Sequence, residues 1–273
     1  MTVLSLKFLT TALYGVSSFR ILATFAVLAI VFSPAAGAQD QKSESVEPQA
    51  QTILITGANR GLGLELARQY SAAGWHVIGT ARKPESAKEL AATGAHVVPL
   101  DVTDQASVDR MAKGLADRPI DVLINNAGIQ PLMWKLAEVD IETYEKALSV
   151  NTVGPVRTTL SLLPNLRSGK GRKIINITTD VSSIAGNTEG GFYGYRESKA
   201  ALNMFTKSLA SELAPEGFVC IVLHPGWVRT DLGGPNAPLG VQESVSGMRS
   251  VIEALQPSDN GSFLTYAGKQ LPW

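Results

Sequence analysis

The stretch TILITGANRGLG (residues 52–63) decides the fold of this chain. Residues 52–56 form an almost continuous apolar run, which is typical of a buried strand in a parallel sheet. Gly57, Gly61 and Gly63 follow the strand and open a helical pattern. Glycines at these positions let backbone N–H groups and the helix N-terminus reach a diphosphate, so the stretch predicts a dinucleotide-binding loop. It contains no Gly-Lys-Ser/Thr, which excludes a P-loop.

Strand-like and helical patterns alternate along the rest of the chain. The strand-like runs lie at 52–56, 76–81, 96–100, 120–128 with its exit loop, 172–178, 219–226 and 261–268. The helical patterns lie at 62–74, 86–94, 104–116, 140–166, 195–214 and 241–255. This alternation predicts a single α/β domain over residues 52–273, a Rossmann-type doubly wound parallel sheet of about seven strands in the order 3-2-1-4-5-6-7. Site residues are then expected just after the strands.

The composition narrows the classes of partner. Lys plus Arg and Asp plus Glu both number 24, so the charge gives no reason to expect nucleic acid. Cys220 is the single cysteine, which excludes an intrachain disulfide. The three histidines lie far apart in the sequence and show no metal-site spacing.

The N-terminal segment differs from the rest. Residues 1–38 combine a basic flank, an apolar stretch and a small-residue pattern, which predicts a signal peptide cut after Ala38. An uncleaved membrane anchor or an over-extended start codon are the alternatives, and membrane contact is expected only through residues 21–33. Residues 39–51 are polar and predict a flexible linker. The protein is exported or membrane-anchored under the first two interpretations and cytoplasmic under the third.

The ends of the second and third strands bear on the choice of cofactor. A carboxylate after the second strand would bind the ribose 2′-hydroxyl of NAD, but Arg82 and Lys83 stand there, and Arg60 lies in the glycine loop. Cations around the ribose pair with a 2′-phosphate, which favours NADP(H) over NAD(H). After the third strand, Asp101 is expected to accept from the adenine amino group with Val102 against the ring.

A tyrosine and a lysine four residues apart begin the fifth helical pattern. In GFYGYRESKAALN (191–203), Tyr195 and Lys199 fall on one helix face, whereas Tyr193 has no such partner. A phenol has a pKa near 10, and a nearby ammonium lowers it, which suits a proton shuttle to a carbonyl or alcohol oxygen.

Together these motifs resemble the short-chain dehydrogenase/reductase family in its single-domain branch. The motifs are TGANRGLG, NNAG (125–128), Asn151 in SVNTVGP, the Tyr195–Lys199 pair and HPGWVRTD (224–231). The sequence is most similar to the carbonyl-reductase group that includes the Sniffer and C-factor proteins. The resemblance implies that Tyr195 is the general acid, that Lys199 binds the nicotinamide ribose and lowers the tyrosine pKa, and that Asn151 bends its helix and holds a relay water.

One position departs from the family pattern. A serine pair is usual after the fifth strand, but INITTDVSS places Thr178 and Thr179 there. Thr179 is favoured as the hydroxyl that binds substrate, with Ser182 as the alternative and Ser183 as a third candidate. The expected cofactor-binding residues are Gly57, Asn59, Arg60, Gly61, Leu62, Gly63, Arg82, Asp101, Val102, Asn125, Ala127, Gly128, Tyr195, Lys199, Pro225, Gly226, Val228 and Thr230.

The resemblance implies an NADP(H)-dependent oxidoreductase that interconverts a small-molecule carbonyl and an alcohol by hydride transfer. The alternative is a nucleotide-binding developmental or signalling protein of C-factor type, whose catalysis is incidental or absent. A homodimer or homotetramer is a further implication of the family, and no substrate is specified by these residues.

Overall fold

The computed structural model describes residues 50–273, which fall in one compact unit. The predicted signal peptide or anchor at 1–38, and the predicted linker apart from its last two residues, lie outside the described residues. Within the described part, no helix is both long and apolar enough to span a bilayer.

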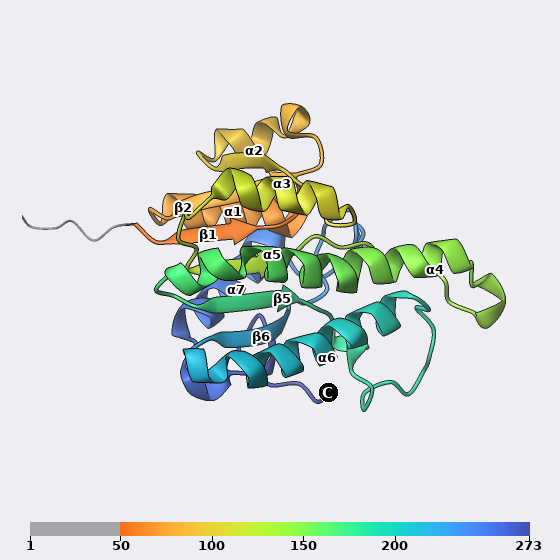
Figure 1. The fold of residues 1–273 in the computed structure, drawn as a ribbon. Coiled ribbons are helices and arrows are strands. Elements are labelled where there is room, and N and C mark those ends of the chain that lie inside the picture. Colours follow the sequence, from red (N-terminus) through yellow and green to blue (C-terminus); the bar gives the residue numbers. More distant parts are fainter. Residues whose placement is uncertain (1–49) are drawn as a thin grey trace, which may run out of the picture. The chain divides into compact units, whose positions relative to one another are not determined.

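A seven-stranded, all-parallel sheet forms the centre of the domain, in the order β3-β2-β1-β4-β5-β6-β7 (Figure 1). Both the fold class and the strand order are as predicted. The strands are β1 (Thr52–Ile55), β2 (His76–Ala81), β3 (His96–Pro99), β4 (Val122–Asn125), β5 (Lys173–Ile177), β6 (Val219–His224) and β7 (Phe263–Thr265). Strand order reverses between β1 and β4, so the crevice for a ligand opens where the chain leaves these two strands.

Helices cover both faces of the sheet. They are α1 (Gly61–Ala72), α2 (Lys88–Ala92), α3 (Gln105–Leu115), α4 (Ile141–Leu148), α5 (Gly154–Ser168), α6 (Tyr195–Leu213) and α7 (Val241–Ala254). Alternate residues of β1 enter different cores: Ile53 and Ile55 pack with α1 and α7, whereas Leu54 packs with α3, α5 and α6. Because both faces of the strand are buried, β1 reads as a continuous apolar run.

The single helix predicted over 140–166 is interrupted. Helices α4 and α5 run end to end (Figure 1), but a π-helical turn, η3 (Ser149–Val153), separates them. Asn151 lies in this turn, and its side chain bonds the backbone of Ile129 rather than staying on the helix surface. Such π turns are rare and often stand at functional sites.

The other helices begin and end close to the predicted residues. The Asp104 carboxylate caps α3 by accepting from the backbone N–H groups of Ala106 and Ser107, as expected. The pattern at 86–94 forms only the short α2, after a 3-10 turn, η1 (Pro84–Ser86). Further 3-10 turns are η2 (Leu136–Glu138), η4 (Asp180–Ser182), η5 (Ala214–Glu216) and η6 (Pro257–Asp259).

Candidate active site

The glycine loop between β1 and α1 has no room for side chains. Gly57 and Gly61 have φ of +63° and +54°, a region that non-glycine residues rarely adopt. A Cβ at Gly57 would stand 3.0 Å from the Ala127 Cα, and one at Gly63 would stand 2.5 Å from the Gly57 carbonyl oxygen. The loop therefore leaves an exposed backbone in front of the α1 N-terminus, which fits the diphosphate of a dinucleotide.

Asn126 holds this loop against the exit of β4. Its Nδ2 donates to the carbonyls of Thr56 (2.9 Å) and Gly57 (3.1 Å). The Thr56 hydroxyl oxygen in turn accepts from the backbone N–H groups of Asn126 and Ala127. Asn126 belongs to the NNAG motif but is not among the cofactor-binding residues expected from the sequence.

Asn125, which is in that set, points the other way. Its Nδ2 donates to Asn176 Oδ1 (2.8 Å) and Thr159 Oγ1 (3.2 Å), inside the core between the sheet and α5. Successive residues of a strand face opposite sides, so only one of the two asparagines can reach the loop. The prediction of a cofactor-facing Asn125 side chain is therefore corrected: Asn126 faces the loop.

The predicted adenosine side carries exposed cations at the carboxyl edge of the sheet. Arg82 is exposed just after β2. Its positive charge is close enough to attract the negative charge of the Asp101 carboxylate. The hydrogen bond from the Thr103 hydroxyl, more than Arg82, holds the pKa of Asp101 below its ordinary value. Val102 is 8% exposed and lies 2.9 Å from the position of a Cβ on Gly154, so its side chain is mostly used in packing.

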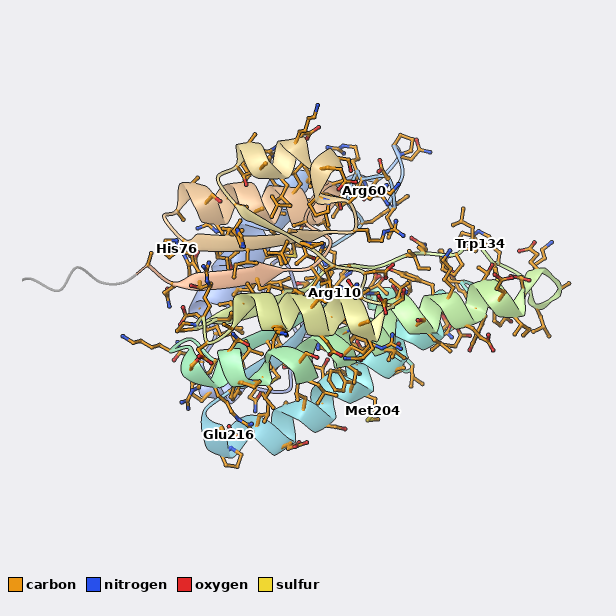
Figure 2. All side chains as sticks on the ribbon, turned by 45° about the horizontal axis from the view of Figure 1, so that its top comes forward. Arg60, His76, Arg110, Trp134, Met204 and Glu216 are labelled. Carbon is orange, nitrogen blue, oxygen red and sulfur yellow. The ribbon has the colours of Figure 1, made fainter. Side chains whose placement is uncertain are left out.

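The loop after β6 closes over the glycine loop. Arg60 Nη1 lies 3.0 Å from Asp231 Oδ2, and both side chains are well exposed. A Cβ on Gly61 would be 3.5 Å from Thr230 Cγ2, so Thr230 stands where a diphosphate would pass. Figure 2 shows Arg60 on the side of the molecule opposite His76, which begins β2. The loop turns at Gly226 (φ +85°), and Val228 is buried beneath it.

Asn151 and Lys199 converge behind Gly128. A Cβ on Gly128 would stand 3.3 Å from Asn151 Oδ1 and 3.6 Å from Lys199 Nζ. The Asn151 carboxamide accepts from the Ile129 N–H and donates to the Ile129 carbonyl, both at 2.9 Å, and also donates to Ser198 Oγ at 3.0 Å. Asn151 thus joins the π turn, the exit of β4 and helix α6.

Tyr195 and Lys199 stand in the first two turns of α6, and both are at least 93% buried, with exposures of 7% and 5%. Lys199 Nζ donates to the Ile177 carbonyl at 2.8 Å. An ammonium has three donors, so two of them stay available for the hydroxyls of a ribose. Burial lowers the pKa of Lys199 to about 8, because desolvation disfavours the charged form.

The predicted lowering of the tyrosine pKa is not found. Burial raises the pKa of Tyr195 to about 12, the nearby Thr179 hydroxyl works in the other direction, and the Asp180 carboxylate adds to the rise. Desolvation of the phenolate therefore outweighs any help from the ammonium of Lys199.

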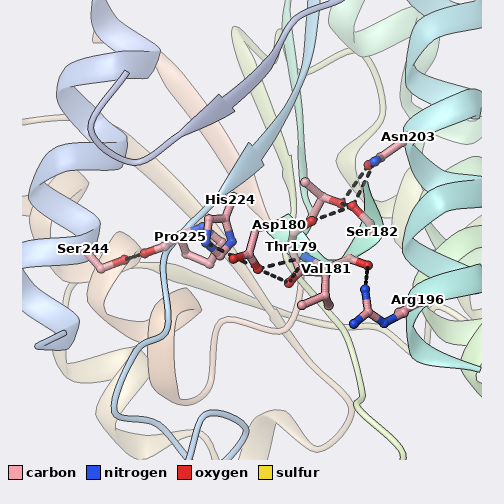
Figure 3. A network of polar contacts seen from close by, with 10 residues as sticks. Thr179, Asp180, Val181, Ser182, Arg196, Asn203, His224, Pro225 and Ser244 are labelled. Atoms are coloured by element: carbon pink, nitrogen blue, oxygen red, sulfur yellow. Dashed lines mark hydrogen bonds and ion pairs between the residues drawn. The ribbon is translucent and has the colours of Figure 1, made fainter. Parts of the chain in front are cut away.

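The three candidate hydroxyls have different surroundings, and Figure 3 shows those of Thr179 and Ser182. Ser182 Oγ donates to the Thr179 carbonyl (2.5 Å) and accepts from Asn203 Nδ2 (2.9 Å), so its capacity is used in the core. Ser183 Oγ donates to the Trp273 carbonyl at 3.1 Å. Only Thr179, among these three, has a hydroxyl close enough to the phenol of Tyr195 to affect its pKa.

A cavity of about 450 Å³ lies beside η4, and Tyr193, Ser183 and Arg196 are among the residues that line it. The α6 residues that line the cavity are on the helix face away from Tyr195 and Lys199. The cavity therefore lies behind the candidate hydroxyls of Thr179, Ser182 and Ser183. The loop around it is braced by Trp134 and Phe192, whose ring centroids are 3.9 Å apart. Tyr193 therefore belongs to the wall of this cavity.

Sequence reasoning missed two titratable residues at this edge. Asp180 directly follows Thr179, and His224 ends β6, with His224 Nε2 3.8 Å from Asp180 Oδ1. Their position just after β5 and at the end of β6 was the available signal, because functional groups of such sheets gather there.

The fold and these contacts define a class: oxidoreductases that bind a nicotinamide dinucleotide at the carboxyl edge of a doubly wound sheet. Two features fit that cofactor. The glycine positions of the loop leave its backbone open, and Lys199 has two donors that are not used by the Ile177 carbonyl. The chain belongs to the short-chain dehydrogenase family, whose model matches residues 51–238.

Individual relatives agree with this membership. The C-signal protein of Myxococcus xanthus is 47% identical over 162 residues, which are 59% of this chain and 98% of the relative. The structure of carbonyl reductase Sniffer of D. melanogaster has a TM-score of 0.77 at 37% identity and covers 82% of this chain and 100% of its own. An NADPH-bound carbonyl reductase from chicken fatty liver has a TM-score of 0.75 at 32% identity, over 82% of this chain and 99% of its own. The resemblance noted from the motifs is confirmed.

Proposed function

We propose that this protein interconverts a small-molecule carbonyl and an alcohol with NADP(H), and that Tyr195 is its general acid and base. The observation that supports this role is the meeting of three groups at the ends of β4 and β5: the Tyr195 phenol, the Thr179 hydroxyl near it, and the Lys199 ammonium one turn along α6. Bound NADPH supplies the hydride to the carbonyl carbon, and NADP⁺ accepts it in the reverse direction.

In the reductive direction, Tyr195 donates its proton to the carbonyl oxygen as the negative charge develops there. A pKa of about 12 keeps the phenol protonated at neutral pH, which suits an acid. Thr179 donates a hydrogen bond to the same oxygen and stabilises the developing charge. The reverse reaction needs the phenolate, which burial of the phenol disfavours.

Lys199 and Asn151 support the proton transfer. The two unused donors of Lys199 are assigned to the nicotinamide ribose hydroxyls. With a pKa of about 8, the ammonium is also able to return a proton toward Tyr195 after each reduction. Asn151 donates a hydrogen bond to the Ile129 carbonyl and so holds it in place beside the route of proton transfer. We assign the relay water to that carbonyl.

The cations near the adenosine end support NADP(H) over NAD(H). Arg60 and Arg82 are exposed at the edge where the 2′-phosphate would lie, and no carboxylate follows β2 at once. Arg60 now pairs with Asp231, but exposed ion pairs contribute only about 0–1 kcal/mol, so a phosphate readily replaces that partner. The glycine loop contributes backbone at Gly57, Asn59, Gly61 and Leu62.

Similarity to the C-signal protein does not favour a purely signalling role. Tyr195, Lys199, Asn151 and a hydroxyl at Thr179 are all in place, and a chain that only bound a nucleotide would not need them together. Export through residues 1–38 and assembly as a homodimer or homotetramer stay proposals, which cell fractionation and light scattering would test.

The decisive experiment compares Tyr195→Phe with the wild type on a panel of aldehydes, ketones and quinones, using NADPH and NADH. We expect Tyr195→Phe to lose at least about 100-fold in kcat, as expected for removal of a general acid. Tyr70→Phe is the matched control, because Tyr70 is buried against α7 on the other face of the sheet. Full turnover by Tyr195→Phe would disprove the assignment.

A further inference from the structure

Asp180 and His224 form a titratable pair directly behind Thr179 (Figure 3). His224 Nε2 and Asp180 Oδ1 are 3.8 Å apart, an ion-pair distance rather than a hydrogen bond. The side chain of His224 is only 13% exposed, whereas that of Asp180 is 59% exposed. Nδ1 of His224 is buried and has no partner among the described residues. The proposed proton transfer from Tyr195 does not use this titratable pair.

The Thr179 hydroxyl is shared between this pair and the reacting groups. Thr179 Oγ1 donates to Asp180 Oδ1 at 3.1 Å, and the same carboxylate oxygen accepts from the Val181 N–H at 2.8 Å. A hydroxyl has one proton to donate. While Thr179 gives that proton to Asp180, it cannot give it to a substrate carbonyl, and Thr179 then offers Tyr195 only an acceptor.

The charge on Asp180 decides this competition. An ionised carboxylate is a stronger acceptor than a neutral carbonyl, so it holds the Thr179 proton. A protonated His224 would neutralise much of the charge on Asp180 and weaken its hold. The proton would then be free to turn toward the substrate oxygen.

We propose that Asp180 and His224 are positioning residues that direct the Thr179 hydroxyl, so that protonation of His224 turns the hydroxyl toward a carbonyl substrate. This inference rests on the proposed role of Thr179 as the hydroxyl that binds substrate. It adds a second ionisation to the pH dependence of the reaction, separate from that of Tyr195.

The sign of the effect follows from the surroundings of His224. Burial lowers its pKa below the ordinary 6.5, and Asp180 acts in the opposite direction. The other titratable or charged groups near the pair are Tyr195 and Arg196 from α6, and Tyr266, whose backbone N–H donates to the His224 carbonyl. Protonation of His224 is therefore an acidic event, and carbonyl reduction should slow as pH rises through it.

The test is the pH profile of kcat/KM for carbonyl reduction in three proteins. For the wild type we expect a fall of roughly two- to tenfold across the His224 ionisation, about the worth of one neutral hydrogen bond. This is smaller than the loss expected for Thr179→Val, because the carboxylate competes for the Thr179 proton and does not remove the donor. Asp180→Asn should lose this step and stay at the faster, low-pH level. His224→Gln should also lose it but stay at the slower, high-pH level. The change should appear in kcat more than in KM.

The alkaline limb of the kcat/KM profile, where Tyr195 loses its proton, gives an independent measurement of the effect of Asp180. Because the Asp180 carboxylate raises the pKa of Tyr195, Asp180→Asn should move that limb to lower pH. Asp180→Glu keeps the negative charge, so both limbs of its pH profile should lie where they lie in the wild type. Asp117→Asn, an exposed carboxylate at the far end of β4, is the control and should match the wild type.

Wild-type profiles in both Asp180→Asn and His224→Gln would overturn the proposal, and so would equal losses in both at every pH. If His224→Gln does not bind NADPH or unfolds early, the Asp180→Asn profile decides alone. Failure here is distinct from failure of the proposed function, because that outcome would appear as an active Tyr195→Phe.

Discussion

The assignment of the substrate-binding hydroxyl separates two effects that are often confounded, activity and stability. Thr179 and Ser182 lie three residues apart, yet Thr179 Oγ1 meets Tyr195 and Asp180, whereas Ser182 Oγ meets only core groups. We predict that Thr179→Val lowers kcat/KM with little loss of stability, and that Ser182→Ala does the reverse.

The magnitudes follow from the contacts. Thr179→Val keeps the shape of the side chain and removes a donor to a developing oxyanion, which costs about 100-fold or more in kcat. Ser182→Ala removes the hydroxyl that accepts from Asn203 Nδ2 at 2.9 Å and donates to the Thr179 carbonyl at 2.5 Å. Both of these buried groups then lack a partner that they have in the wild type. Unsatisfied buried groups cost about 1–3 kcal/mol, so Tm should fall by roughly 2–12 °C in a domain of this size.

The assay pairs NADPH oxidation on one good carbonyl substrate with thermal unfolding of the same preparations. Thr179→Ser, which restores a hydroxyl, should recover most of the activity. The reasoning is refuted if Ser182→Ala is inactive but as stable as the wild type, or if Thr179→Val turns over normally.

Three further predictions concern the cofactor site and the buried lysine. Gly63→Ala should weaken NADPH binding and destabilise the domain by about 1–3 kcal/mol, because its Cβ would meet the Gly57 carbonyl at 2.5 Å; calorimetry and unfolding would measure both, and an unchanged protein would contradict the close fit. Arg82→Asp should lower kcat/KM with NADPH relative to NADH by about 10- to 100-fold, since a charge that attracts the 2′-phosphate becomes one that repels it; an unchanged ratio would show that Arg82 points away. The unfolded chain binds a proton at Lys199 up to pH 10.5 but the native protein only up to about 8, so stability should rise with pH between these values. Denaturant unfolding of Lys199→Met should lack that rise, and an equal slope in both proteins would argue against the assigned ionisation.

Most of the fold could be predicted from local patterns. The continuous apolar run at 52–56 and the glycines after it specify a buried strand, a tight turn and a helix, because each depends on neighbours in sequence. The strand order followed from the alternation and the handedness of crossovers. The break in the 140–166 helix was not predicted as a π turn, because it depends on the bonds between Asn151 and Ile129, which come together only in the folded chain.

By itself, the sequence determined the family, the parallel sheet, the glycine loop and the pairing of Tyr195 with Lys199, since a spacing of four residues on a helix sets two side chains on one face. Tertiary structure decided which of several similar residues serves the site. It turned Asn126 rather than Asn125 toward the loop, placed Thr179 rather than Ser182 at Tyr195, and brought His224 to Asp180 across two strands. Burial also reversed the expected shift of the tyrosine pKa. These outcomes depend on the direction of each side chain and on what lies around it, and neither is written in the spacing of residues along the chain.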